Sequence, residues 1–215
     1  APAEDLKRAG SGKTNKKKLT AVPVKKGRKK DWAKKAAALP KAKKAAAPTG
    51  PFEPQLAKLG ESPPQGEQWI HELKWDGYRI LATIAKGEVR LWSRNALEWT
   101  DKIPDIRDAV EALGLESGAL DGELIAGTGT KRDFNLLQST LSGEHLGKLS
   151  YALFDVLHLN GVDVSDAPLL ERKALLQELL EDAPAHLAFS SHIKHIEEAA
   201  VDSIDTNLRL RGTSE

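Results

Sequence analysis

The stretch HELKWDGYRI, residues 71–80, decides how the surrounding chain folds. Ile, Trp and Tyr favour β-strands, whereas Asp76–Gly77 is a strong turn signal. The stretch therefore predicts a strand, a tight turn and a second strand, with Lys74 at the end of the first strand. A lysine in that position is either a solvated residue at the rim of a sheet or a nucleophile on a rigid element that a substrate can approach.

The near-neutral total charge of +1 hides two oppositely charged parts of the chain. Residues 1–50 contain 16 Lys and Arg against 3 Asp and Glu, a net charge of +13. Residues 51–215 contain 16 Lys and Arg against 28 Asp and Glu, a net charge of −12. A basic segment almost without aromatic residues, joined to an acidic one, predicts a solvated tail next to a folded part.

The basic part, residues 1–50, is rich in Lys, Ala, Pro and Gly, and Pro23, Pro40 and Pro48 interrupt any helix in it. We predict a disordered basic linker over this range. Its charge suits non-specific attraction to nucleic-acid phosphates through counterion release, but a solubilising tether has the same composition.

Several classes of protein are excluded by composition. The absence of cysteine excludes disulfides, zinc fingers of the Cys type and thiol catalysis. No segment resembles a signal peptide, and the apolar runs are too short to span a bilayer, so we expect a cytoplasmic protein without a membrane partner. The chain has no Met and begins at Ala1, and we therefore expect a fragment of a longer protein.

From residue 51 onward the pattern is that of a globular domain. Three strands are expected at 69–74, 78–85 and 88–93, separated by turns at 76–77 and 86–87, as in an antiparallel meander. A helix is expected from an N-cap at Thr100 or Asp101 to Gly114. The remaining expected elements are a strand at 118–127, a helix at 133–141, a strand at 149–161 and a helix at 168–182 with leucines on one face. Neighbouring strands with helices between them predict an α+β fold.

Four short motifs follow one another in this globular part. They are KWDGYR at 74–79, SRN at 93–95, DGE at 121–123 and FD at 154–155. Each motif alone is weak evidence, because Lys-x-Asp-Gly is common in hairpins and an apolar strand containing Phe is usually core. Their order and spacing, with strand-like flanks throughout, form a much stronger signal.

This set of motifs resembles that of the covalent nucleotidyltransferases, which comprise ATP-dependent DNA ligases, RNA ligases and capping enzymes. The similarity is greatest to the ligase domain of bacterial ligase D and covers about residues 52–193. It implies a nucleotidyltransferase (adenylation) fold of antiparallel sheets flanked by helices in residues 51–215. The OB-type β-barrel that follows in that family is absent from this sequence.

The resemblance implies an ATP-dependent DNA ligase, in which the amine of Lys74 attacks the α-phosphate of ATP to give lysyl-AMP. The AMP passes to a 5′-phosphate, and the nick or break in duplex DNA is sealed. A lysine must lose its proton to attack, and the apolar neighbours Leu73 and Trp75 are compatible with a lowered pKa. The implied setting is DNA repair and end joining at the bacterial nucleoid, with polymerase and phosphoesterase domains and the bacterial Ku protein as partners.

The resemblance also implies a role for each remaining motif residue. Glu72 would contact the adenine amino edge, Arg79 and Arg94 would hold ribose or phosphate oxygens, Glu123 would bind the ribose or a Mg²⁺ or Mn²⁺ ion, and Phe154 would stack on the adenine. Each role has a plainer alternative: a cross-strand ion pair for Glu72 and Arg79, a rim position for Arg94, a turn for Glu123 and core packing for Phe154.

Other residues are expected to have structural roles. Asp76 and Gly77 would form the turn that aims Lys74, and Asp155 would order a strand end rather than bind a metal. His192 and His195 are three residues apart on a possible helix and, without a third ligand, are expected at the surface like the other histidines.

The family pattern continues with Glu-Gly-hydrophobic-x-x-Lys and Lys-x-Lys motifs that this sequence lacks, although Glu197–Glu198 lie near the expected place of the first. The final stretch DSIDTNLRLRGTSE, residues 202–215, predicts a truncated or frameshifted end. Two alternatives to the ligase therefore stay open. One is an inactive relic that binds nucleic acid through its basic tail, and the other is an RNA ligase or capping-type enzyme.

Overall fold

The computed structural model describes residues 30–56, 66–145, 147–193 and 208–212. The chain divides into two units, Ala1–Lys30 and Asp31–Glu215, and every described helix and strand lies in the second. The N-terminal part of the predicted linker, 1–29, therefore lies outside the described residues. Among the residues that are described, no helix is long and apolar enough to cross a membrane.

The larger of two sheets has seven strands in the order β1-β7-β6-β5-β3-β4, with β8 paired in parallel to β6. All other pairs in it are antiparallel. Its strands are β1 (Lys43–Lys44), β3 (Tyr78–Ala85), β4 (Glu88–Ser93), β5 (Ser117–Ala126), β6 (Leu149–Leu159), β7 (Val162–Asp163) and β8 (Leu187–Phe189). The predicted turn at Lys86–Gly87 is confirmed, since both residues have positive φ, as a two-residue hairpin turn requires.

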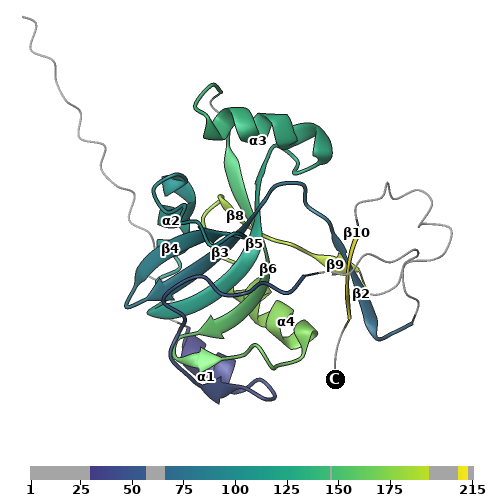
Figure 1. Cartoon of the computed structure of the whole chain (residues 1–215). Coiled ribbons are helices and arrows are strands. Elements are labelled where there is room, and N and C mark those ends of the chain that lie inside the picture. The colour runs from purple at the N-terminus through teal and green to yellow at the C-terminus, as the bar shows by residue number, and fades with distance from the viewer. Residues whose placement is uncertain (1–29, 57–65, 146, 194–207, 213–215) are drawn as a thin grey trace, which may run out of the picture. The chain divides into compact units, whose positions relative to one another are not determined.

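The smaller sheet has three strands in the order β10-β2-β9, with β2 (Trp69–Leu73) in the centre (Figure 1). Its outer strands are β9 (His192–Ile193) and β10 (Leu208–Gly212), both antiparallel to β2. The predicted meander is therefore wrong for its first strand, because β2 and β3 belong to different sheets. The chain also crosses between the sheets from β8 to β9, with only Ser190 and Ser191 in between.

The Asp76–Gly77 turn between β2 and β3 has a different cause from the one predicted. Gly77 does not have positive φ, as a hairpin glycine would. A Cβ at Gly77 would lie 2.0 Å from the backbone oxygen of Leu124, so only glycine lets the chain pass this close to β5. The stretch 74–77 is thus a link that carries the chain from one sheet to the other.

Five helical segments accompany the sheets. They are α1 (Trp32–Ala37), α2 (Pro104–Glu111), η1 (Lys131–Asp133), α3 (Phe134–Leu141) and α4 (Leu169–Leu179). The helix predicted after residue 100 is α2, but its N-cap is Ile103 rather than Thr100 or Asp101. The Thr100 hydroxyl is already engaged, since it accepts a hydrogen bond from the Leu91 amide and donates one to Glu98.

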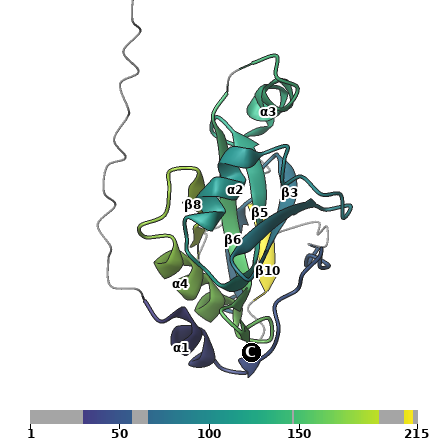
Figure 2. The same cartoon turned by 90° about the vertical axis from the view of Figure 1, so that its left-hand side faces the viewer.

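The first helix contradicts part of the predicted disordered linker. Asp31 caps α1 by accepting a hydrogen bond from the Lys34 amide, and Ala36 is fully buried in the core. Lys35 pairs with Glu178 of α4 at 2.7 Å, and the two helices lie next to each other in Figure 2. Residues 31–50 therefore contain a helix that belongs to the described fold, and the predicted boundary at residue 50 lies too far along the chain.

The two faces of the larger sheet differ in chemistry, because successive side chains of a strand point to opposite sides. Tyr78 of β3 packs against Trp99 and Phe134 on one face, with ring centroids 5.2 and 5.5 Å apart. Arg79, the next residue, points to the other face. That second face carries the polar cluster described next.

Candidate active site

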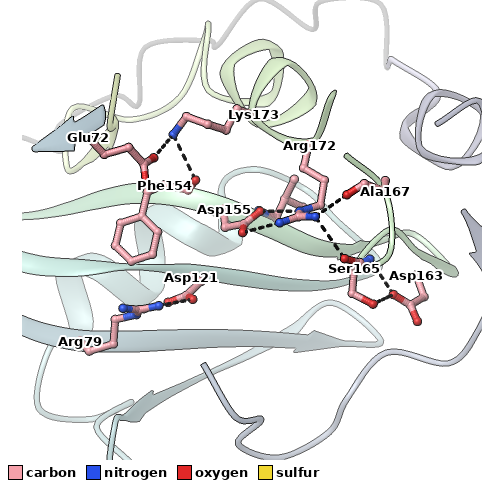
Figure 3. Close-up of polar contacts among 11 residues, drawn as sticks. Glu72, Arg79, Asp121, Phe154, Asp155, Asp163, Ser165, Ala167, Arg172 and Lys173 are labelled. Carbon is pink, nitrogen blue, oxygen red and sulfur yellow. Dashed lines mark hydrogen bonds and ion pairs between the residues drawn. The ribbon is translucent and has the colours of Figure 1, made fainter. Parts of the chain in front are cut away.

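A buried ion pair joins β3 and β5. The Arg79 guanidinium donates two hydrogen bonds to the Asp121 carboxylate, of 2.5 and 2.6 Å, and both side chains are almost fully buried (Figure 3). Burial by itself would lower the pKa of Arg79, but the hydrogen bonds and charge of Asp121, together with the charge of Glu123, raise that pKa above its ordinary value. Arg79 therefore keeps its positive charge within the fold.

Glu123 lies beside this ion pair. Its Cα is paired with that of Arg79 in the β3–β5 register, so Arg79, Asp121 and Glu123 share one face of the sheet. Gly122 between the two carboxylates lies where β5 and β6 approach closely, and a Cβ there would lie 2.6 Å from the Ala152 carbonyl oxygen. The Asp-Gly-Glu motif thus places two acids on one face across a position that needs glycine.

Phe154 of β6 completes this cluster. The Arg79 guanidinium carbon lies 4.5 Å from the centroid of the Phe154 ring, which suits a cation–π contact. Phe154 is only 2% exposed. The structure therefore brings together Arg79, Glu123 and Phe154 among the predicted site residues, and it covers the aromatic ring with the guanidinium.

Glu72 reaches the same region from the smaller sheet, through a partner that the sequence analysis missed. Lys173 of α4 donates a hydrogen bond to Oε1 of Glu72, and both side chains are buried (Figure 3). The same ammonium donates to the carbonyl oxygens of Phe154 and Ser190, at 3.3 and 3.0 Å. The plainer alternative, a cross-strand ion pair between Glu72 and Arg79, is not what the structure shows, because the two residues pair with Lys173 and Asp121.

The neighbouring residue of α4, Arg172, was also missed. It donates to both carboxylate oxygens of Asp155 at 2.9 and 3.0 Å, and to the carbonyl oxygens of Ser165 and Ala167. Asp155 is thereby held within β6 (Leu149–Leu159) rather than at a strand end, where it was expected. The spacing of Arg172 and Lys173 from Leu169, three and four residues, could have revealed them, because it places both on the buried stripe of the helix.

Lys74 and Arg94 lie apart from this network of contacts. The Lys74 ammonium pairs with the Asp76 carboxylate at 2.8 Å, and the lysine side chain is 52% exposed. The predicted apolar surroundings of Lys74 are therefore wrong, since β2 ends at Leu73, which is itself 47% exposed. Asp76 contacts Lys74 directly, and Arg94 is exposed in the turn after β4.

The expectation that histidines lie at the surface is wrong for His71 and His158, which are buried. Burial lowers the pKa of His71. His192 lies in β9 rather than on a helix, while His195 and Glu197–Glu198 fall outside the described residues. Within the described ranges, no three His, Asp or Glu side chains gather as a metal site would require.

Two sheets flanked by helices, antiparallel except for the β6–β8 pair, form the fold of the ligase D ligase domains, which is the adenylation fold of the nucleotidyltransferases. The chain belongs to the family described as ATP dependent DNA ligase domain, whose pattern matches residues 46–206.

Relatives within this family include three proteins with a clear match. The "Multifunctional non-homologous end joining protein LigD" of Pseudomonas aeruginosa is 43% identical over 129 residues, which are 60% of this chain and 15% of that protein. The "SPbeta prophage-derived DNA ligase-like protein LigB" of Bacillus subtilis is 33% identical over 61% of this chain and 48% of that protein. The DNA ligase of Natronomonas pharaonis is 30% identical over 72% of this chain and 30% of that protein. This chain thus spans less than half the length of each of these relatives.

Solved structures support the same fold. The "mycobacterial DNA ligase D complexed with ATP and MES" superposes with a TM-score of 0.61 at 23% identity, over 76% of this chain and 55% of that one. The ligase domain from M. tuberculosis LigD gives a TM-score of 0.56 at 23% identity, over 69% of this chain and 50% of that one. This likeness establishes the arrangement of the sheets.

Proposed function

We propose that this chain is the adenylation part of an ATP-dependent DNA ligase of the ligase D type. The observation that carries the proposal is the buried cluster of Arg79, Asp121, Glu123 and Phe154 on one sheet face. Glu72 approaches it through Lys173. Membership of the ligase family and a related structure complexed with ATP support the choice of nucleotide.

In the proposed reaction the Lys74 amine attacks the α-phosphorus of ATP. A phosphorus–nitrogen bond forms, the bond from that phosphorus to the oxygen bridging to the β-phosphate breaks, and pyrophosphate leaves. AMP then passes from Lys74 to the 5′-phosphate of DNA, and a 3′-hydroxyl displaces it to form the phosphodiester. Nicked or broken duplex DNA is the proposed substrate, as the family and the end-joining relative suggest.

Lys74 has to lose a proton before it attacks, because only the neutral amine is nucleophilic. Its ammonium group pairs with the Asp76 carboxylate at 2.8 Å, so this carboxylate is the group placed to take up the proton. We assign Asp76 to this role, since its carboxylate is the acceptor already hydrogen-bonded to the lysine.

The base would enter beside Phe154 and Glu72. The guanidinium of Arg79 lies over the Phe154 ring in this structure. We propose that adenine takes this place on the ring and that the guanidinium then turns to ribose or phosphate oxygens. Because Glu72 and Phe154 are 1% and 2% exposed, nucleotide entry requires their neighbours to move. Arg94, exposed after β4, is proposed to meet phosphate oxygens from outside.

A divalent cation fits this site when most of its ligands come from the nucleotide rather than from the protein. Glu123 supplies a carboxylate, the kind of ligand that Mg²⁺ and Mn²⁺ take, while Asp121 is already bound by Arg79. Mg²⁺ commonly binds through one or two carboxylates plus substrate phosphates, so a single protein carboxylate suffices. When bound, the ion would neutralise charge on the α-phosphate and the leaving pyrophosphate.

The test is transfer of label from α-labelled ATP to the full chain with Mg²⁺. We expect label that stays with the denatured protein, withstands alkali and is released by acid, as a phosphoramidate is. Lys74→Ala should abolish it, and Lys131→Ala, an exposed lysine in η1, should leave it unchanged. Addition of nicked DNA should then move the label to the 5′-phosphate.

Three results would overturn the proposal. Label that persists in Lys74→Ala would assign the covalent bond to another residue. Complete absence of labelling and of AMP binding, with DNA binding retained, would favour a non-catalytic nucleic-acid-binding role. Transfer of label to nicked RNA in preference to DNA would instead indicate an RNA ligase.

A further inference from the structure

We propose that Lys173 is a positioning residue for base recognition, which holds Glu72 as an ionised acceptor for the amino group of adenine. This inference rests on the proposed function, and it assigns to α4 a part in nucleotide selectivity. It starts from the buried Glu72–Lys173 pair that joins the smaller sheet to α4.

All three N–H donors of the Lys173 ammonium meet acceptors in the same part of the fold. An ammonium has three N–H donors, and here they meet Glu72, the Phe154 carbonyl and the Ser190 carbonyl. These acceptors come from β2, from β6 and from the crossing between β8 and β9. Lys173 therefore fixes Glu72 relative to Phe154, the two residues that are proposed to bind the base.

The position of Lys173 is itself fixed by its neighbour. Arg172 binds Asp155 with two hydrogen bonds of 2.9 and 3.0 Å, and Asp155 follows Phe154 directly in β6. This contact anchors α4 on β6 at the level of the aromatic ring (Figure 3). The Lys173 ammonium is also 5.1 Å from the centroid of Phe189, so an aromatic face covers it.

The chemistry of the pair suits an exocyclic amino group. Burying a carboxylate without a compensating cation costs free energy, and the ammonium supplies that cation. A carboxylate accepts hydrogen bonds and can accept several, so Glu72 can bond to Lys173 and to a ligand donor at the same time. The 6-amino group of adenine donates a hydrogen bond, whereas a 6-oxo group accepts one and a purine without a 6-substituent has no donor at that position.

The experiment compares ATP with purine riboside triphosphate, which lacks the 6-amino group, in the labelling of Lys74. In Lys173→Met we expect the KM for ATP to rise about 10- to 100-fold, as for the loss of a hydrogen bond to a charged group, with little change in kcat. Labelling by purine riboside triphosphate should change less than about threefold, because it makes no bond to Glu72. Lys173→Arg, which keeps the charge, should restore part of the preference for ATP.

Two further variants separate positioning from general damage. Lys35→Met removes another Lys–Glu pair of α4, that with Glu178, and should leave the ratio between the two nucleotides unchanged. Glu72→Gln should lower the preference for ATP as Lys173→Met does, and the double variant should lose little more. Binding of AMP and purine riboside monophosphate by calorimetry gives the same comparison without turnover.

Each outcome is decisive. An equal loss with both nucleotides, or an unchanged ratio in Lys173→Met, would overturn the positioning role while the ligase assignment stands. A wild-type chain that neither binds nor is labelled by either nucleotide would overturn the proposed function itself, and this inference with it. Should Lys173→Met fail to fold, Lys173→Arg and Glu72→Gln supply the ratio.

Discussion

At the scale of single residues, the buried ion pair of Arg79 and Asp121 stabilises the fold only while both partners are present. Replacing Asp121 by Ala leaves a buried guanidinium without its carboxylate. We expect the free energy of unfolding to fall by about 3–5 kcal/mol, as when one partner of a buried ion pair is removed. Urea unfolding monitored by circular dichroism measures this loss.

The matched control for Asp121→Ala is Glu88→Ala. It removes the partner of Arg90 from an exposed pair in β4 and should change stability by no more than about 1 kcal/mol. Equal effects of the two variants would contradict the assigned importance of burial.

Tyr151 gives the protein a pH dependence in the alkaline range. Burial raises the pKa of this phenol well above its usual value, and the charge of Asp121 raises it further. Between the unfolded pKa of about 10 and the higher folded pKa, the folded state binds more protons than the unfolded state, so stability falls as pH rises. We expect this fall to approach about 1.4 kcal/mol per pH unit, in addition to contributions from other groups.

Tyr151→Phe should remove the part of the loss of stability at high pH that Tyr151 causes, because phenylalanine has no proton to release. Urea unfolding of both proteins at a series of pH values above neutrality measures the difference in slope. Parallel pH profiles would show that Tyr151 ionises in the folded state without cost.

At the scale of elements, α1 is part of the folded domain. Ala36 faces the core and Ala37 faces solvent, so the two positions differ mainly in burial. Ala36→Glu places a charge without a partner in the core and should lower the free energy of unfolding by more than about 3 kcal/mol. Ala37→Glu should stay within about 0.5 kcal/mol of wild type, as for exposed positions. Similar urea midpoints for both variants would show that α1 is not part of the folded domain.

The elements that could be predicted from the sequence are those fixed by local patterns. The apolar run of β3, the alternation in β4, the positive-φ turn at Lys86–Gly87 and the leucine spacing of α4 all depend on neighbours close in sequence. The sheet to which β2 belongs could not be predicted, because its partners β9 and β10 lie near the other end of the chain.

The candidate site also contains some residues that could be predicted from the sequence and others that could not. Arg79, Glu123 and Phe154 could be placed in one site because their motifs, in that order, resemble those of the nucleotidyltransferases, and the structure brings the three residues together. The ionic partners Asp121, Arg172 and Lys173 were missed, because charged residues in a helix or a turn usually face solvent. Only the tertiary contacts show which of them are buried.

For the molecule as a whole, charge is divided between the basic residues 1–50 and the acidic remainder. Counterion release predicts that the basic segment dominates binding to duplex DNA and makes it depend on salt. Replacing Lys16, Lys17 and Lys18 by Gln in the full chain should lower the slope of log K against log salt concentration by up to about 3. Fluorescence anisotropy with labelled duplex DNA measures this slope. The same slope in the triple variant would show that other residues contact the phosphates.

Two of the crossings between the sheets are very short, and this restricts how the two sheets can move apart. Ser190–Ser191 spans at most about 7 Å when extended, and Lys74–Gly77 forms the other short crossing. Two such tethers prevent the sheets from separating by translation, so opening has to be a swing about a hinge line through both. Points on a hinge line move least. Lys74 would therefore keep its place while the neighbours of Glu72 and Phe154 move to admit a nucleotide.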